Sequence, residues 1–237
     1  MQNHHLLDIL NTFSRKEMTR FVEFSRSPYH HKHEPTQALI TYFDKCYPEF
    51  SERLCDRKVI WKKLFPKQSF DSSKLALLFT YAWRLCENFL IEEQLAQHSQ
   101  REQWLLIALR ERRQWTIYER QLKKSKTALI KTTQRDTDYY RQVMALAEEA
   151  NEFYTVWEPQ AHDQSLVEKE HALDQYYVLE KLRDAVQLQM RRQILQGDYS
   201  ARLLEGVLEE LRLNGEAYRE APAVQVYYQL YQMMDQP

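Results

Sequence analysis

Glycine is scarce in this chain of 237 residues: there are three, Gly197, Gly206 and Gly215, and none precedes position 197. Phosphate-binding loops need glycine for positive φ and for close approach of the backbone to the phosphate. Neither a Walker-type loop nor a dinucleotide fingerprint can therefore be written, and the G-x-S-x-G turn of serine hydrolases is missing too. Sheet folds rich in hairpins, which depend on glycine turns, are disfavoured.

Cysteines and long apolar runs are also few. Cys46, Cys55 and Cys86 are odd in number and include no Cys-x-x-Cys pair, which argues against a disulfide framework and a zinc ribbon. The longest nearly apolar run, residues 75–83, is far shorter than the ~20 residues that cross a bilayer. The first residues lack the basic start and apolar core of a signal peptide. We therefore expect a cytoplasmic protein with no membrane partner.

No charge of one sign dominates the composition. The chain carries 33 basic and 34 acidic residues, a formal charge of −1, so overall charge gives no argument for a nucleic-acid or membrane partner. Hydrophobic residues are 43% and charged residues 28%, as in a folded globular protein. A chain of this length can bury a proper core.

Helical periodicity runs through nearly the whole sequence. Apolar residues recur at spacings of three and four, between good helix formers such as Glu, Lys, Gln, Arg and Ala. Ser14 and Glu17 have the spacing of a capping box, and Phe13 can pack on Met18. The pattern leaves open whether 101–113 and 115–131 are one bent helix. Helices are expected over residues 5–11, 15–24, 35–45, a short segment between the prolines at 48 and 66, 71–96, 101–113, 115–131, 137–154, 165–195, 200–213 and 222–234.

The sequence thus predicts an all-α fold of stacked helical hairpins, a degenerate TPR-like or solenoid type without β-sheet. A Tyr-Tyr pair recurs at 139–140, 176–177 and 227–228, which is compatible with such units although the spacing is uneven. The expected organisation is an N-terminal helical region, a central helical hairpin, a polar linker and C-terminal hairpins, which can also pack as one domain over 1–237. Their ranges are 1–97, 98–156, 157–164 and 165–237.

The long segment 165–195 carries two apolar stripes. The first lies within about 40° of one direction and the second roughly 100° or more away, at 100° per residue. A helix buried on two sides is an interior layer of a stack. The first stripe is Ala172, Tyr176, Leu179, Val186, Met190 and Ile194, and the second is Leu173, Tyr177, Leu188 and Leu195.

The apolar helix 222–234 has no polar capping unit after it. Solenoids need such a unit. Either this helix is itself covered, or the natural chain continues past Pro237, or a partner covers it.

Three histidines, His30, His31 and His33, lie in a segment bracketed by prolines, which predicts a loop. Imidazoles packed as H-H-x-H cannot easily converge on one metal ion, and Pro35 interrupts the helix that an H-E-x-x-H site needs. We expect no metal and no cofactor here, but a solvated loop in which Tyr29 packs inward.

Charge is distributed unevenly along the middle of the chain. Residues 101–135 hold ten basic and three acidic residues, net +7, and residues 136–174 hold ten acidic and two basic residues, net −8. On one continuous helix Arg113, Arg120, Lys124 and Lys131 lie within about 20° of a single line, opposite Trp115, Tyr118, Leu122 and Leu129.

Two interpretations of this pattern remain open. The basic and acidic helices can fold back as a hairpin and pair their flanks, each exposed pair adding about 0–1 kcal/mol. Alternatively, the basic stripe faces outward and binds an acidic protein segment or a phosphate backbone.

From these features we expect a non-enzymatic helical-repeat adaptor or scaffold that binds another protein, with Arg113, Arg120, Lys124 and Lys131 as the candidate partner-binding residues. Nucleic-acid binding through the same stripe is the alternative. An unrecognised enzyme, with no catalytic residue to name, is the third.

Four segments resemble an uncharacterised family of all-helical bacterial proteins: FVEFSRSPYHHKHEPTQAL, VIWKKLFP, YYVLEKLR and VYYQLY. Members carry a Phe-rich helix, a Ser-Pro-Tyr turn and later helices that start with Tyr-Tyr. The likeness is spread over the whole chain and implies no activity and no site residues. Members often have asparagine where this chain has His30 and His31, which argues against histidine ligands, and tend to be longer, which favours continuation past Pro237.

Overall fold

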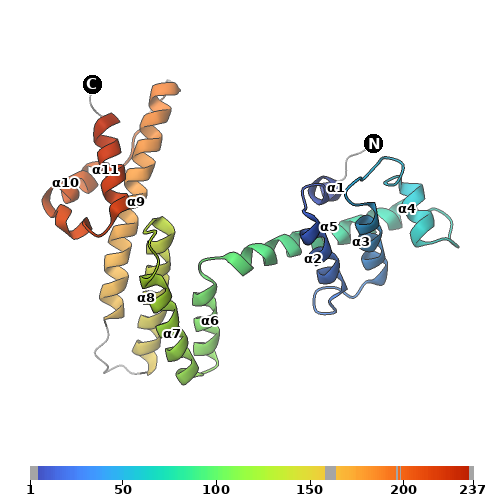
Figure 1. The fold of residues 1–237 in the computed structure, drawn as a ribbon, viewed down its shortest axis with the longest axis horizontal. Coiled ribbons are helices and arrows are strands. Elements are labelled where there is room, and N and C mark those ends of the chain that lie inside the picture. Colours follow the sequence, from blue (N-terminus) through green and yellow to red (C-terminus); the bar gives the residue numbers. More distant parts are fainter. Residues whose placement is uncertain (1–4, 158–163, 196, 198, 235–237) are drawn as a thin grey trace. The chain divides into compact units, whose positions relative to one another are not determined.

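The computed structural model describes residues 5–157, 164–195, 197 and 199–234, which form helices and connecting turns with no strand (Figure 1). The predicted all-α class is confirmed. The chain divides into two compact units, Met1–Gln97 and His98–Pro237. Most of the predicted linker falls on 158–163, outside the described residues. None of the described helices is both long and apolar enough to cross a membrane.

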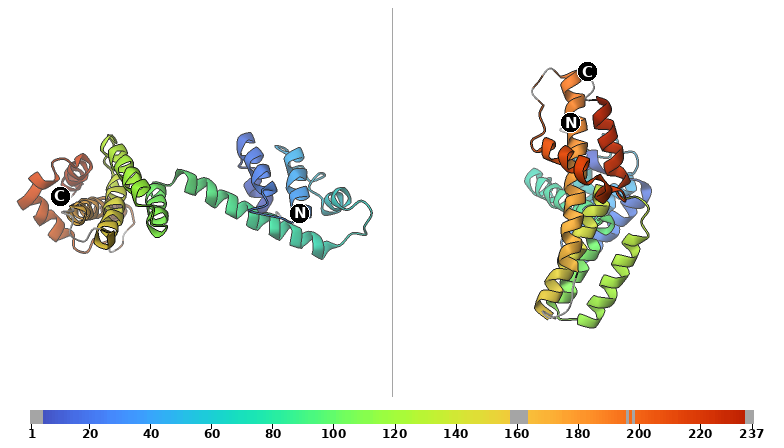
Figure 2. Two further views of the ribbon diagram at one scale, coloured as in Figure 1. Left: turned by 90° about the horizontal axis from the view of Figure 1, so that it is seen from below. Right: turned by 90° about the vertical axis from the view of Figure 1, so that its left-hand side faces the viewer.

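Unit 1 is built on its longest helix, α5, against which α1, α2, α3 and α4 pack (Figures 1 and 2). Phe13, Phe21 and Phe24 all make ring contacts with Phe89 of α5, with centroids 5.3–5.7 Å apart, and Phe21 is fully buried. The helices of this unit are α1 His5–Leu10, α2 Arg15–Arg26, α3 Glu34–Cys46, α4 Arg57–Leu64 and α5 Ser72–Gln97.

The start of α2 confirms the capping box expected from the sequence. The backbone N–H of Glu17 donates to Ser14 Oγ at 3.2 Å, and the backbone N–H of Ser14 donates to Glu17 Oε2 at 2.6 Å. Phe13 and Met18 on either side of the cap are both buried in the core of unit 1. Because two backbone donors at the helix end are satisfied reciprocally, the helix begins at a defined residue.

Unit 2 contains two apolar clusters in a row along the hairpin of α8 and α9. One lies between α6, α7 and α8, and the other between α8, α9, α10 and α11. In Figures 1 and 2, α11 lies along the C-terminal half of α9. The elements of this unit are α6 Arg101–Glu111, α7 Trp115–Ile130, α8 Thr137–Trp157, α9 Ser165–Ile194, α10 Leu204–Asn214, the 3₁₀ helix η1 Gly215–Tyr218 and α11 Pro222–Met234.

The recurring tyrosine pairs meet in the second of these clusters. Five of the six tyrosines belong to it, so the pairs mark positions where three helices share one core. The sixth, Tyr177, faces solvent. The five are Tyr139, Tyr140, Tyr176, Tyr227 and Tyr228.

The expectation that α9 is buried on two sides is wrong. In the second stripe Leu173, Tyr177 and Leu195 are exposed. The physical reason is that α8, α10 and α11 all cover the same half of α9: at 100° per residue, every buried residue of this helix falls within one half of its circumference.

Removing the Phe21 ring tests the core of unit 1. The Phe21→Ala substitution leaves a cavity among Phe13, Phe89 and their neighbours, and we expect it to lower the free energy of unfolding of unit 1 by about 3–5 kcal/mol. Leu77→Ala, at an exposed position of α5, is the matched control and should change it by less than about 0.5 kcal/mol. Urea unfolding followed by circular dichroism measures both. Similar losses in the two variants would contradict the packing described here.

Candidate functional site

One side of α7 is held tightly against α8. The Tyr118 ring is fully buried and stacks on Phe153, with centroids 4.2 Å apart, and its hydroxyl donates to the backbone carbonyl of Glu149 at 3.0 Å. Trp115 contacts Phe153 and Trp157 at centroid distances of 5.7 and 4.4 Å. Because the aromatic side of α7 faces the core, its opposite side faces solvent.

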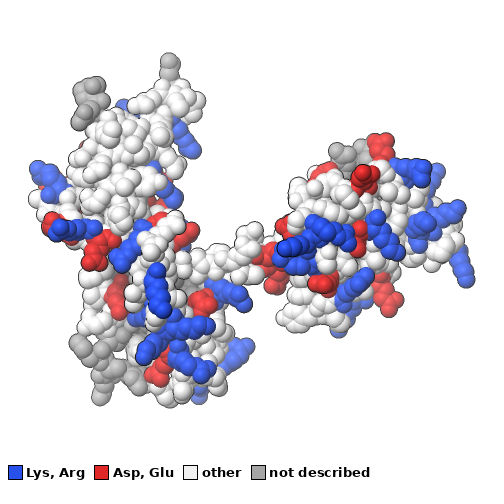
Figure 3. Space-filling model, in the orientation of Figure 1, with Lys and Arg blue, Asp and Glu red and all other residues white. Residues whose placement is uncertain are grey.

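The solvent side of α7 carries four exposed cations, which we call the basic face: Arg120, Lys123, Lys124 and Lys131. Figure 3 shows Lys and Arg side chains gathered over this helix. No ion pair or hydrogen bond joins the side chains of these four to another residue in the described part of the chain. Their charge is therefore available to an external anion.

Arg113 does not belong to this face. The predicted line required one continuous helix through residue 113, but α6 ends at Glu111, α7 begins at Trp115, and Arg113 lies in the turn between them with φ of 54°. This left-handed conformation breaks the helix, so the angular argument that aligned Arg113 with the other cations fails there. Arg113 is exposed at the start of α7, and no interaction joins it to another described side chain.

Two cations near the basic face, Arg110 and Lys126, form ion pairs with the acidic helices. This is the pairing that the hairpin interpretation predicts. Arg110 pairs with Glu149 of α8, at 2.6 Å between Nε and Oε1 and 3.1 Å between Nη2 and Oε2. Lys126 Nζ lies 2.6 Å from Oε2 of Glu168 in α9. Pairing with α8 and α9 thus neutralises the cations that face these acidic helices. Among the described residues, the cations of the basic face have no such pairing.

The Arg110–Glu149 pair is the buried member of this set. The Glu149 side chain is 3% exposed and that of Arg110 is 27% exposed. The hydrogen bonds that Arg110 donates to Glu149 raise the pKa of the guanidinium. The guanidinium therefore stays charged, and the pair joins α6 to α8 with a fixed geometry.

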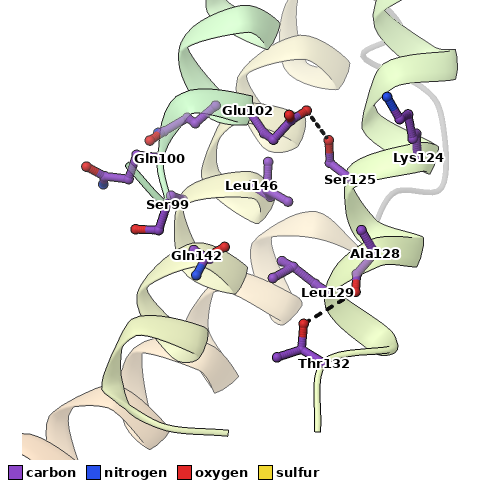
Figure 4. Close-up of a pocket in the computed structure, with 12 residues that line it drawn as sticks. Ser99, Gln100, Glu102, Lys124, Ser125, Ala128, Leu129, Thr132, Gln142 and Leu146 are labelled. Atoms are coloured by element: carbon purple, nitrogen blue, oxygen red, sulfur yellow. Dashed lines mark hydrogen bonds between the residues drawn. The ribbon is translucent and has the colours of Figure 1, made fainter. Parts of the chain in front are cut away.

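A cavity of about 220 Å³ lies beside the basic face, between α7, α8 and the start of α6 (Figure 4). Leu129 and Leu146 form part of its apolar lining, and Gln142 and Thr132 add neutral polar groups. Lys124 belongs both to this lining and to the basic face. A single side chain of a docked segment could therefore enter the cavity while its neighbours meet the cations.

Carboxylate oxygens near the cavity are already occupied. Glu102 accepts a hydrogen bond from the Ser125 hydroxyl at 3.1 Å and another from the Gln121 side-chain amide. The sequence did not indicate this cavity, because its lining comes from three helices that meet only in the folded chain. Among the lining residues, Lys124 is the one that the sequence indicates as a binding candidate, and Leu129 the one that it places toward the core.

The rings of the histidine loop are held by packing and hydrogen bonding. His30 stacks on Phe24, with centroids 4.0 Å apart, and Nδ1 of His33 lies 2.8 Å from Thr36 Oγ1. Within the described residues no three His, Cys, Asp or Glu side chains are grouped as metal ligands would be. The expectation that Tyr29 packs inward is wrong: its side chain is 91% exposed, because His30 occupies the place on Phe24 and Tyr29 lies against the edge of His30.

The thiols of Cys55 and Cys86 are less acidic than an ordinary cysteine thiol, which disfavours a nucleophilic role. Burial raises the pKa of Cys55 to about 11 and that of Cys86 to about 12. A reactive cysteine needs a lowered pKa so that the thiolate is present near neutral pH. Both side chains act as small core residues instead.

Unit 1 carries a larger groove, of about 1,320 Å³, between α1, the segment 50–58 and α5. Phe50 and Phe79 line it, together with charged residues of both signs. It exceeds the volume of a typical small-molecule site. Its lining carries both acidic and basic residues. Its charge therefore does not favour an acidic over a basic ligand, unlike the charge of the basic face.

Comparisons with protein-family models, with curated proteins and with solved structures find no match to this chain. The function is therefore inferred from the geometry of the molecule.

Substitution of Arg110 and substitution of Glu149 should lower the free energy of unfolding by different amounts. Arg110→Met leaves the buried Glu149 carboxylate without a partner, so we expect the free energy of unfolding to fall by about 3–5 kcal/mol. Glu149→Gln should cost less, about 1–3 kcal/mol, because the partly exposed guanidinium can turn to water. Lys126→Met, which breaks an exposed pair, is the control and should cost at most ~1 kcal/mol. Equal losses for Arg110→Met and Lys126→Met in urea unfolding would contradict the burial argument.

Acidification should destabilise unit 1 through His31. Burial, with a smaller contribution from His33, lowers the pKa of His31 below 6.5, and its Nε2 is buried without a hydrogen-bond partner among the described residues. The unfolded chain therefore takes up the proton first, so the contribution is complete above pH ~6.5, decreases as pH falls below it, and levels off below the folded pKa. Urea midpoints measured from about pH 8 to 5 should show this decrease in the parent, and His31→Gln should lack it.

The matched control is His171→Gln, at an exposed position of α9. It should keep the pH profile of the parent. An unchanged profile in His31→Gln would rule out His31 as the source of the decrease.

Proposed function

We propose that the protein is a non-enzymatic helical adaptor that docks an acidic segment of another protein on the basic face of α7. The observation that carries the proposal is that the side chains of Arg120, Lys123, Lys124 and Lys131 have no partner among the described residues, beside neighbours that are paired. Unpaired like charges on one helix face repel each other, and an acidic ligand relieves that repulsion. Cytoplasmic location, expected from the cysteine content, belongs to the same proposal.

The face is better suited to a protein than to nucleic acid. Ile117 and Ile130 are exposed on the same side of α7 as the cations, and an apolar side chain gains nothing from a phosphate backbone. Binding of single strands uses outward aromatic rings as stacking platforms, whereas Trp115 and Tyr118 face the core. An acidic helix or loop with some apolar side chains matches cations and isoleucines together.

Binding of a labelled peptide tests the proposal. The probe is a fluorescein-labelled peptide of glutamate and leucine in an amphipathic helical pattern, and fluorescence anisotropy with the full chain measures its dissociation constant. We expect Arg120→Glu/Lys124→Glu to weaken binding by about tenfold or more, since it replaces two attractive contacts by repulsive ones. Binding should also weaken as ionic strength rises, because the contacts are exposed.

The matched control is Lys62→Glu/Lys63→Glu on α4, which makes the same change in net charge at exposed positions of unit 1. It should leave the dissociation constant within about twofold of the parent, well under the tenfold step of 1.4 kcal/mol. Equal weakening in both double variants would mean that only net charge matters and would refute a specific site. Tighter binding of a single-stranded RNA or a DNA duplex than of the peptide, with a steep salt dependence, would replace the proposal by nucleic-acid binding.

A further inference from the structure

The cavity beside the basic face has room for a single ring. Its volume is about 220 Å³, and it lies within unit 2, between α7, α8 and the start of α6. An apolar protein cavity of ~150 Å³ is large enough to bind benzene. A helix, with a diameter of ~10 Å including its side chains, cannot enter. The space therefore suits one side chain of a ligand, with a six-membered ring and part of the chain that carries it.

Four apolar side chains from α7 and α8 line the cavity. Leu146 belongs to the buried cluster between α6, α7 and α8, and Leu129 packs against that cluster. Ala128 and Ala145 contribute only methyl groups, which leave the space open. Figure 4 shows the two leucines between the helices. An apolar group that enters here extends the core of unit 2 and is removed from water, which favours its binding.

The charges in the lining disfavour a charged occupant. Glu102 and Lys124 are the two charged residues among the twelve that line the cavity. A carboxylate inside would be repelled by Glu102, which already accepts hydrogen bonds from Ser125 and Gln121. A cation inside would be repelled by Lys124 and the rest of the basic face. The occupant is therefore neutral, and acidic residues of the ligand stay outside the cavity.

The volume favours a ring over a branched aliphatic side chain. Leucine and isoleucine side chains are smaller than a benzyl group, so they would leave part of the space unfilled and lose contacts with the lining. Aromatic side chains also have few rotatable bonds, so holding one in place costs little conformational entropy. Such residues are frequent anchors at contacts between proteins.

We propose that the cavity is an anchor site for one aromatic side chain of the acidic segment that docks on α7. This inference rests on the proposed function and deepens it, because it gives the ligand a second required feature, a neutral ring next to its carboxylates. Lys124 belongs both to the basic face and to the lining of the cavity. A carboxylate that pairs with Lys124 therefore lies close to the ring in the sequence of the ligand.

Labelled peptides that differ at one position test the anchor. The first is the peptide of glutamate and leucine used above, and in the others a single leucine, at each position in turn, is replaced by phenylalanine. Fluorescence anisotropy with the full chain measures the dissociation constants. We expect at least one phenylalanine peptide to bind the parent about tenfold more tightly than the leucine peptide, because its ring fills the space that leucine leaves open.

Ala128→Phe fills the cavity from α7 with a ring of the protein itself. Ala128 is exposed, so the variant should fold as the parent does, which circular dichroism checks. The dissociation constants of the leucine and phenylalanine peptides should then agree within about twofold. Ala76→Phe, at an exposed position of α5 in unit 1, is the matched control and should keep the preference of the parent for phenylalanine.

Arg120→Glu/Lys123→Glu separates this inference from the adaptor proposal, since neither residue lines the cavity. It should weaken the binding of all the peptides alike and leave their ratios unchanged. Peptides that need the cations but show no preference for phenylalanine at any position would overturn the anchor and leave the adaptor proposal standing. A preference that persists in Ala128→Phe would also overturn the anchor. If no peptide needs the cations, the adaptor proposal fails and the anchor fails with it.

Discussion

The arrangement of the first half of unit 2 depends on Glu149 of α8. Its carboxylate accepts two hydrogen bonds from Arg110 of α6, and its backbone carbonyl accepts the hydroxyl of Tyr118 from α7. A buried carboxylate is stable only when it is fully paired, so this residue requires α6 and α7 to lie in fixed positions on α8. The stacking of Tyr118 on Phe153 adds to the same constraint.

The positions of α6 and α7 on α8 divide the cations of residues 101–135 into two groups, those that face the acidic helices and those that face solvent. Arg110 and Lys126 turn toward acidic helices and are neutralised, while no carboxylate of the described residues pairs with Arg120 or Lys124. The two interpretations of the charge pattern therefore apply to different residues of one segment. The hairpin explains the paired cations, and the adaptor proposal rests on the unpaired ones.

The sequence by itself determined the helices and their class. Local signals were sufficient there: the Ser14–Glu17 capping box, the proline that starts α11 and the near absence of glycine act within one turn of the chain or by composition. It also located the basic segment, because charge counts need no structure. The sequence left open whether the helix continues through residue 113. Because the chain turns at Arg113, the predicted alignment of Arg113 with the other cations is wrong.

Only the tertiary structure decided which faces are covered. Sequence periodicity shows that α9 has two apolar stripes, but the lengths and positions of α8, α10 and α11 decide that one stripe is buried up to Val186 and that the other is exposed. Likewise, the pairing of Arg110 rather than Arg120 depends on which carboxylate lies opposite in space. Burial and ion pairing are sums over residues far apart in the chain, and a pattern read along one helix does not contain them.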